Sequence, residues 1–170
     1  MTAETKACAM DPEGLRAVEA LFQQQIDEGL HPGASLAVYH HGRLVLELFG
    51  GLARFYTMLA AGGTLDGVRI LSPESVERAT AVQVEVERDR SLGIPMRWAL
   101  GFHLGGNRVD LFGYDTSPRA FGHGGHGSCV GWADPDVGLA VAIITNGLRS
   151  PAGHALRVAA LSAAIRKACL

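Results

Sequence analysis

The chain has 170 residues, of which 48% are hydrophobic and 19% are charged, and its formal net charge is −2. This length and composition are typical of a single globular domain over residues 1–170, and they exclude a disordered chain and a membrane protein. Lys6 and Lys167 are the only lysines, so the sequence offers no basic face for nucleic acid and no polybasic segment for an anionic membrane. We therefore expect small or neutral binding partners.

The cysteines and the N-terminal residues predict the cellular compartment of the protein. Cys8, Cys129 and Cys169 are odd in number and widely spaced, which indicates free thiols and matches no metal-ligand or redox spacing. Residues 1–14 lack the apolar segment of a signal peptide, and no run approaches the ~20 apolar residues that span a membrane. We expect a cytoplasmic protein that binds no metal and no cofactor.

The first predicted element is a helix that begins with the Asp-Pro-Glu signal at residues 11–13. Asp is a good N-cap, Pro is favoured at the first helical position, and Glu complements the helix dipole. Gly29 is expected to end the helix. The apolar residues that recur on one helical face are Leu15, Val18, Phe22 and Ile26.

A β-hairpin is predicted next, with strands over residues 34–40 and 43–49. The His41-Gly42 dipeptide between them suits a tight turn. Both faces of the hairpin are apolar, so we expect other elements to cover both sides of the sheet. With a two-residue turn, the residues that share one face are Ala37, Tyr39, Leu44, Leu46 and Leu48.

The middle of the chain predicts two helices and an irregular segment. One helix begins at Leu52, carries Phe55 and Leu59 on its apolar face, and ends at Gly62-Gly63. The second begins at a Ser-Pro-Glu signal at residues 72–74. Residues 83–95 are charged and weakly patterned, which indicates an irregular crossing.

The last third predicts strands and a closing helix. The expected strands are 97–104 and 107–113 around Gly105-Gly106, and then a hairpin of 129–133 and 138–145, whose second arm is typical of a central strand. Ser150-Pro151 is expected to cap a final helix with Val158, Leu161 and Ile165 facing inward. The order of elements predicts an α+β fold, in which an antiparallel β-sheet is flanked by N- and C-terminal helices.

Four segments, in their order along the chain, resemble the opening and closing parts of the β-lactamase-related serine hydrolases. They are HPGASLAVYHHGRLVLELFGG (31–51), ARFYTMLAAGGTLDGVRILSPESVERAT (53–80), WALGFHL (98–104) and FGHGGHGSCVGWADPDVGLAVAIITN (121–146). This family includes class C β-lactamases, β-lactamase-like carboxylesterases and D-aminopeptidases. The resemblance implies the α/β core of the β-lactamase-like fold without most of its helical domain.

The resemblance also implies a candidate site. Family members carry Ser-x-x-Lys as nucleophile and base, Tyr-x-Asn or Ser-x-Asn as proton shuttle, and Lys-Thr-Gly or His-x-Gly on a strand beside the site. His123-Gly124-Gly125 is similar to the third motif. It implies that His123 shapes the pocket, that the backbone N–H of His126 is an oxyanion donor, and that Gly124 and Gly125 let a substrate lie against the backbone. The ligand would be a small ester, amide or β-lactam.

The other two family motifs are missing from the chain. Ala3 and Ala164 stand three residues before the two lysines, so no Ser-x-x-Lys is present. No tyrosine or serine is followed two positions later by asparagine, so the second motif is missing too. Against the family pattern, this implies an internal deletion near residues 50–53.

Two other chemistries of the same segment remain less favoured. A zinc site of His123 and His126 would need His103 or Asp134 as a third ligand, and glycine loops hold metals poorly without supporting contacts. A new triad of Ser128, one of these histidines and Asp134 would need hydrogen-bond geometry that neighbours along a strand rarely achieve, because their side chains point to opposite faces. We therefore predict no metal in this segment.

Two functional hypotheses of different class follow. In the first, the chain is a β-lactamase-related hydrolase by fold and descent that has lost all or nearly all activity. In the second, it is a binding or self-associating module that forms a homo-oligomer, because loss of a helical domain leaves an apolar surface that needs a partner.

Overall fold

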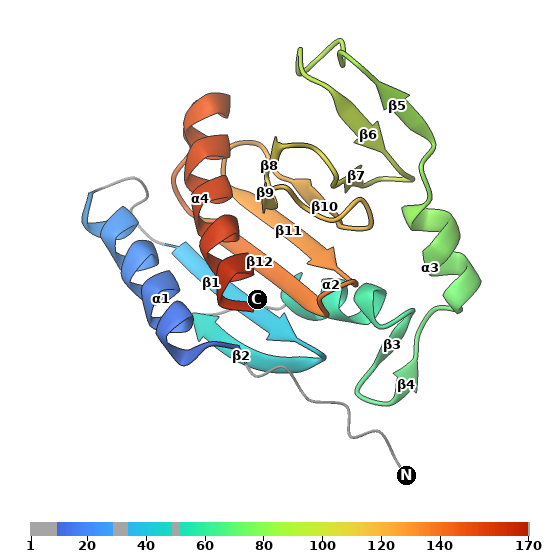
Figure 1. Cartoon of the computed structure of the whole chain (residues 1–170), viewed down its shortest axis with the longest axis horizontal. Coiled ribbons are helices and arrows are strands. Elements are labelled where there is room, and N and C mark those ends of the chain that lie inside the picture. The colour runs from blue at the N-terminus through green and yellow to red at the C-terminus, as the bar shows by residue number, and fades with distance from the viewer. Residues whose placement is uncertain (1–9, 29–33, 49–51, 170) are drawn as a thin grey trace.

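The computed structural model describes residues 10–28, 34–48 and 52–169 (Figure 1). The helices in this part of the chain are α1 (Pro12–Asp27), α2 (Leu52–Ala60), α3 (Pro73–Thr80) and α4 (Pro151–Cys169). The strands are β1 (Ala34–His40), β2 (Arg43–Leu48), β3 (Thr64–Leu65), β4 (Val68–Arg69), β5 (Val84–Val86), β6 (Met96–Trp98), β7 (His103–Leu104), β8 (Val109–Asp110), β9 (Gly113–Tyr114), β10 (Phe121–Gly124), β11 (Cys129–Asp134) and β12 (Leu139–Thr145).

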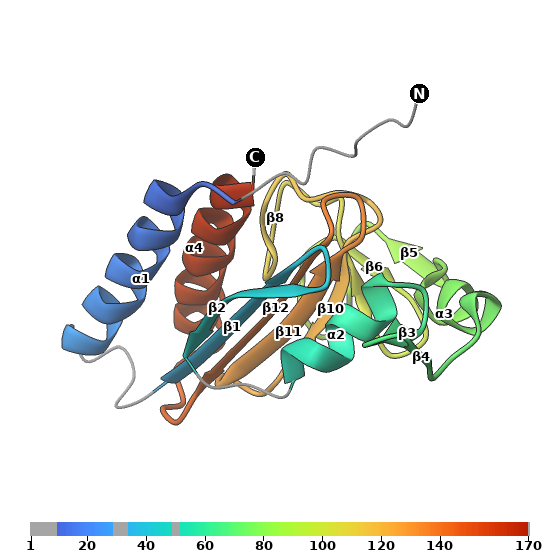
Figure 2. The ribbon, with the colours of Figure 1, turned by 90° about the horizontal axis from the view of Figure 1, so that it is seen from below.

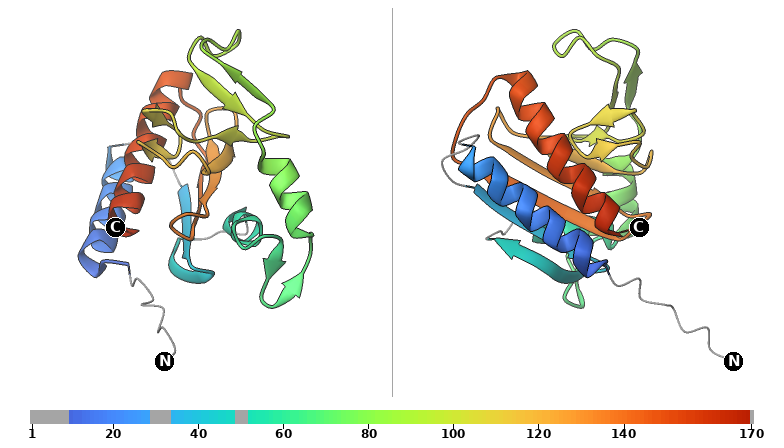
Figure 3. Two further views of the ribbon diagram at one scale, coloured as in Figure 1. Left: turned by 45° about the vertical axis from the view of Figure 1, so that its right-hand side comes forward. Right: turned by 60° about the vertical axis from the view of Figure 1, so that its left-hand side comes forward.

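Eight strands form one sheet in the order β2-β1-β12-β11-β10-β7-β6-β5, and all neighbouring strands are antiparallel. Helices α1 and α4 lie on one face of this sheet and α2 lies on the other (Figure 2). The predicted α+β class is therefore confirmed, including the N- and C-terminal helices. Figure 3 shows α1 and α4 side by side across the sheet. In the described residues, no helix has the length and apolarity needed to cross a membrane.

Strand β12 separates two apolar layers. Leu139, Val141 and Ile143 belong to the layer under α1 and α4, whereas Ala140 and Ala142 belong to the layer under α2. Large residues on one face and small residues on the other let α2 approach the sheet closely. Because both faces of the strand are covered, its sequence is a continuous apolar run, as predicted for a central strand.

Local signals place the long helices correctly. The side chain of Asp11 caps α1 by accepting hydrogen bonds from the N–H groups of Glu13 and Gly14, at 3.1 and 2.8 Å. The hydroxyl of Ser150 accepts a hydrogen bond from the N–H of Gly153 at the start of α4. The predicted stop at Gly29 lies outside the described residues, and α1 ends at Asp27.

The register of the first hairpin differs from the prediction. Tyr39 pairs with Leu44 as expected, but a β-bulge between Val38 and Tyr39 brings Leu46 opposite Val38. Leu46 therefore lies in the layer under α1 and α4, and not beside Ala37. The sequence-based expectation was wrong because a single extra residue in one strand reverses the faces of all residues beyond it.

Three other predictions for the middle strands were also wrong. Residues 83–95 include strand β5, which pairs with β6 at the edge of the sheet. Residues 97–104 are two strands, β6 and β7, because the chain reverses near Gly101, whose φ is +81°. Residues 107–113 bend at Asp110, whose carboxylate accepts hydrogen bonds from the Phe112 N–H and the Thr116 hydroxyl, and they form the separate β8–β9 pair.

Candidate functional site

The His-Gly-Gly segment lies at the end of strand β10, inside the large sheet. His123 pairs with Gly131 of β11, and the start of β10 pairs with β7. The chain then turns through residues 125–128, and the N–H of Gly125 donates to the carbonyl of Cys129 at 2.8 Å. We call residues 125–128 the glycine turn. Both His123 and His126 are exposed.

Internal packing explains the two glycines of the motif. A Cβ atom on Gly124 would lie 2.7 Å from Cδ1 of Leu111, and one on Gly125 would overlap Sγ of Cys129. Any larger residue at either position would displace these neighbours. Packing inside the chain therefore favours glycine at both positions, and a substrate lying against this backbone stays a prediction.

The imidazole of His123 has a defined orientation. Its Nδ1 lies 2.7 Å from the carbonyl oxygen of Gly124. A carbonyl only accepts hydrogen bonds, so Nδ1 carries a hydrogen, and in the neutral form of the ring Nε2 carries the lone pair. His123 can therefore present a hydrogen-bond acceptor through Nε2.

Two aromatic residues support His123 from strands β6 and β7. The ring centroid of His103 lies 4.5 Å from that of His123 and 4.3 Å from that of Trp98, in a T-shaped pair with Trp98. The centroids of Trp98 and His123 lie 6.4 Å apart. The indole Nε1 of Trp98 donates to Asp89 at 3.2 Å. Burial, with a smaller contribution from His123, lowers the pKa of His103 to about 4, so His103 is neutral at pH 7.

His126 lies in the glycine turn, where the structure assigns no acceptor among the described residues to its backbone N–H. The following residue, Gly127, has a φ of +70°, and a Cβ there would lie 2.9 Å from the carbonyl oxygen of Arg149. This conformation is unfavourable for other residues. The turn therefore leaves the His126 N–H accessible to water or to a ligand oxygen.

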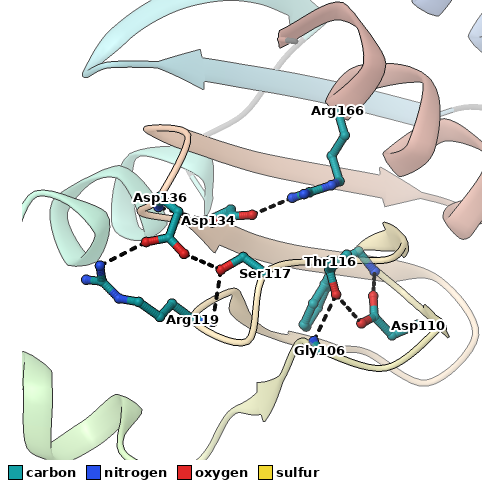
Figure 4. A network of polar contacts seen from close by, with 9 residues as sticks. Gly106, Asp110, Thr116, Ser117, Arg119, Asp134, Asp136 and Arg166 are labelled. Carbon is teal, nitrogen blue, oxygen red and sulfur yellow. Dashed lines mark hydrogen bonds and ion pairs between the residues drawn. The ribbon is translucent and has the colours of Figure 1, made fainter.

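Asp134 lies far from both histidines of the motif. Its carboxylate is fully buried and accepts a 2.5 Å hydrogen bond from Arg166 of α4 (Figure 4). Ser128 and Asp134 lie at opposite ends of β11, about 20 Å apart at the rise of an extended strand. This separation argues against the triad, and among residues 10–28, 34–48 and 52–169 no group of three His, Cys, Asp or Glu side chains could hold a metal ion.

Helix α2 places a tyrosine behind the strand that carries His123. Tyr56 is buried, and burial raises its pKa to about 12, although a backbone hydrogen bond at His123 acts in the opposite direction. The tyrosine is therefore neutral at pH 7 and is no base. The helix predicted from Leu52 is confirmed, but its buried face includes Tyr56, whereas Phe55 is 45% exposed.

Comparison with known proteins identifies the family. The family model Beta-lactamase matches residues 50–165. The chain belongs to the Beta-lactamase family. Over 100 residues it is 41% identical to the esterase/beta-lactamase LipL of Mycobacterium tuberculosis. The aligned region covers 59% of this chain and 22% of LipL. The chain spans about a fifth of the curated relatives that it matches.

Solved structures of the Beta-lactamase type agree with this assignment. A penicillin-binding protein homologue from Caulobacter crescentus superimposes with a TM-score of 0.57 and 32% identity, over 69% of this chain and 30% of the other. A family VIII carboxylesterase gives a TM-score of 0.55 and 33% identity, over 71% and 31% of the two chains. The resemblance stated from the sequence is thus confirmed at the level of family and fold.

The sequence reasoning named His103 only as a possible third zinc ligand, and it missed Trp98 and Arg157 as neighbours of the candidate site. Trp98 and His103 lie beside His123 because β6 and β7 continue the sheet beyond β10. Arg157 contacts the glycine turn from α4. The only signal for Arg157 in the sequence is a charged residue next to the inward-facing Val158.

Proposed function

We propose that this chain carries one wall of a β-lactamase-type serine hydrolase site and has little or no hydrolytic turnover of its own. The observation that carries the proposal is the combination of His123-Gly124-Gly125 with the lack of Ser-x-x-Lys, Tyr-x-Asn and Ser-x-Asn in the 170 residues. The ligand class is a small ester, amide or β-lactam. This class is consistent with the name of LipL, esterase/beta-lactamase.

The missing nucleophile determines the expected rate. Loss of the nucleophile of a serine hydrolase costs on the order of a millionfold in kcat, or about 8 kcal/mol in activation free energy. The family resemblance assigns the second oxyanion donor to the nucleophile's own backbone N–H. A single remaining donor at His126 is hydrated before it meets a ligand, so it stabilises an oxyanion weakly.

Hydrolysis assays test the proposal directly. We expect the wild-type chain to hydrolyse a chromogenic cephalosporin and short-chain nitrophenyl esters no faster than the Ser128→Ala variant, and a fluorophosphonate probe to leave the intact mass unchanged. Ser128 is the serine of the glycine turn, so it is the residue on which any unrecognised activity would depend. Turnover that Ser128→Ala abolishes, or stoichiometric labelling, would show that the chain is an active hydrolase.

A second candidate function is self-association into a homo-oligomer. It is favoured by apolar side chains that are exposed on structured elements: Ile144 on the central strand β12 is 40% exposed, and Phe55 on α2 is 45% exposed. Sedimentation velocity over a hundredfold range of concentration tests this candidate. A sedimentation coefficient that rises with concentration supports self-association, and a constant monomer value refutes it.

A further inference from the structure

Helix α4 holds the glycine turn from the side opposite to solvent. Arg157 is 5% exposed, and its Nη2 lies 2.9 Å from the carbonyl oxygen of Gly127. The same nitrogen lies 3.0 Å from the carbonyl oxygen of Gly147 and 2.9 Å from Oγ1 of Thr145. One buried guanidinium therefore joins the glycine turn to the segment that connects β12 with α4.

Thr145 adds two bonds to the same turn. Its hydroxyl donates to the carbonyl oxygen of Ser128 at 2.7 Å, and its backbone N–H donates to the same oxygen at 2.8 Å. The hydroxyl oxygen in turn accepts from Arg157. Charged donors form stronger hydrogen bonds than neutral ones, and burial removes the competition from water.

These bonds enclose the peptide unit that carries the candidate oxyanion donor. Before His126, the N–H of Gly125 is bonded to the carbonyl of Cys129; after it, the carbonyls of Gly127 and Ser128 are bonded to Arg157 and Thr145. The backbone is thus fixed on both sides of His126. The direction of the His126 N–H follows from these fixed neighbours.

We propose that Arg157 is a positioning residue, which acts with Thr145 to hold the glycine turn so that the His126 N–H faces the ligand. The proposal rests on the proposed function of this turn as a wall of the site. Arg157 itself touches no ligand. Its effect is to pre-organise the turn, so that no ordering of the turn is needed when an oxygen binds.

Amide hydrogen exchange of the full chain, measured residue by residue by NMR, tests the proposal. The reporters are the N–H groups of Gly125 and Thr145, because each closes one side of the turn, and Val141 of β12 serves as the internal reference. In Arg157→Ala we expect exchange at both reporters to accelerate by about tenfold or more relative to Val141. In Arg157→Lys the acceleration is smaller than in Arg157→Ala, since an ammonium group keeps the charge and the donors, but it is not abolished, since that group lacks the planar fork of arginine.

Arg166→Ala is the matched control, because Arg166 lies on the same helix and also binds a buried oxygen, but at the opposite end of β11. We expect it to lower global stability and to accelerate exchange at Gly125 no more than at Val141. Equal acceleration at Gly125, Thr145 and Val141 in Arg157→Ala would show a general structural role and overturn the proposal. If Arg157→Ala does not fold, Thr145→Val provides the same comparison, and unchanged exchange at Gly125 in that variant would overturn the proposal.

A ligand titration separates this proposal from the proposed function. Benzylpenicillin added to the labelled wild-type chain is expected to shift the amide resonances of Gly124, Gly125 and His126, with at least threefold weaker binding in Arg157→Ala. Wild-type shifts that persist with equal affinity in Arg157→Ala would overturn the positioning role. If the wild type shows no shifts while the exchange results hold, Arg157 fixes the turn but the turn is no ligand wall, and the proposed function fails.

Discussion

At the scale of single residues, burial separates the ion pairs around Asp134. Asp134 is fully buried and Arg166 is 13% exposed, whereas the nearby pair of Asp136 and Arg119 is largely exposed (Figure 4). Removal of one partner from a buried pair leaves an uncompensated charge in a medium of low polarity, which is much more costly than removal of an exposed partner.

Arg166→Ala should therefore destabilise the protein by about 3 kcal/mol or more in the free energy of unfolding. Arg119→Ala, the matched surface variant, should change this free energy by less than about 1 kcal/mol. Urea unfolding followed by circular dichroism measures both values. Equal losses in the two variants would show that burial of the Asp134 pair has no energetic consequence.

His103 gives the molecule a defined dependence on pH. Its pKa of about 4 in the folded protein lies below the usual value of 6.5, because partial burial and, to a smaller extent, the neighbouring His123 disfavour the charged ring. Between these two pH values the unfolded chain binds a proton that the folded chain does not bind. The contribution of His103 to stability is thus fully present above pH 6.5 and is lost as the pH falls towards 4.

His103→Phe keeps a ring beside Trp98 and His123 but removes this titration. We expect the urea midpoint of the variant to fall less than that of the wild type between pH 7 and pH 4.5. Both proteins still lose stability on acidification, because burial also lowers the pKa values of His40 and His154. An identical fall in both midpoints would be evidence against a depressed pKa at His103.

At the scale of elements, the contact between α2 and β11 depends on a residue without a side chain. A Cβ on Gly131 would overlap the ring of Tyr56 and lie 3.0 Å from Cδ2 of Leu52. Gly131 is also the pairing partner of His123. The glycine therefore determines how closely α2 approaches the strands that carry the candidate site.

Gly131→Ala should accordingly destabilise the fold by about 1–3 kcal/mol through overpacking. The double variant Gly131→Ala with Tyr56→Leu should recover part of this loss, because the smaller side chain makes room for the new methyl group. Thermal unfolding of the two variants and of Tyr56→Leu alone completes the cycle. Strictly additive losses would show that Gly131 and Tyr56 do not share a contact.

Elements whose signals are local were predicted correctly from the sequence. The caps at Asp11, Ser72 and Ser150 lie within three residues of the N–H groups they bind, so the sequence alone specifies them. Strand β5 was not predicted, and the predicted strands 97–104 and 107–113 are each divided, since strands of two or three residues are stabilised by partners elsewhere in the chain. The bulge at Val38 was missed because it changes register without changing composition.

The residues of the candidate site also divide into those with a local sequence signal and those brought together only by the fold. The segment from His123 to His126 is contiguous and was found through its motif. His103 and Trp98 are about 20 residues or more away in sequence, and Arg157 is about 30 residues away, so only the order of strands and the packing of α4 bring them to the motif. Trp98 and Arg157 were thus recognised as neighbours only in the folded chain, whereas His103 had been named from the sequence solely as a possible zinc ligand.

At the scale of the whole molecule, the large sheet has a stable centre and weak edges. Residues 139–144 of β12 are paired on both sides and residues 139–143 are buried, whereas β5 is a three-residue edge strand paired only with β6. We expect amide exchange to be slowest in β12 and fastest among the strands in β5. Comparable protection in the two strands by exchange mass spectrometry would contradict this gradient.

The alternation of large and small residues along β12 makes the sheet a partition between two cores. Substitution of a large residue of β12 changes the packed volume only in the layer under α1 and α4. The alanines on the other face are unchanged, so the layer under α2 keeps its volume. A protein divided in this way accumulates neutral changes in one core without altering the geometry of the other. For directed evolution, the large apolar residues of β12 are thus a place to introduce diversity, whereas the α2 core and Arg157 of α4, which holds the glycine turn, are to be kept constant.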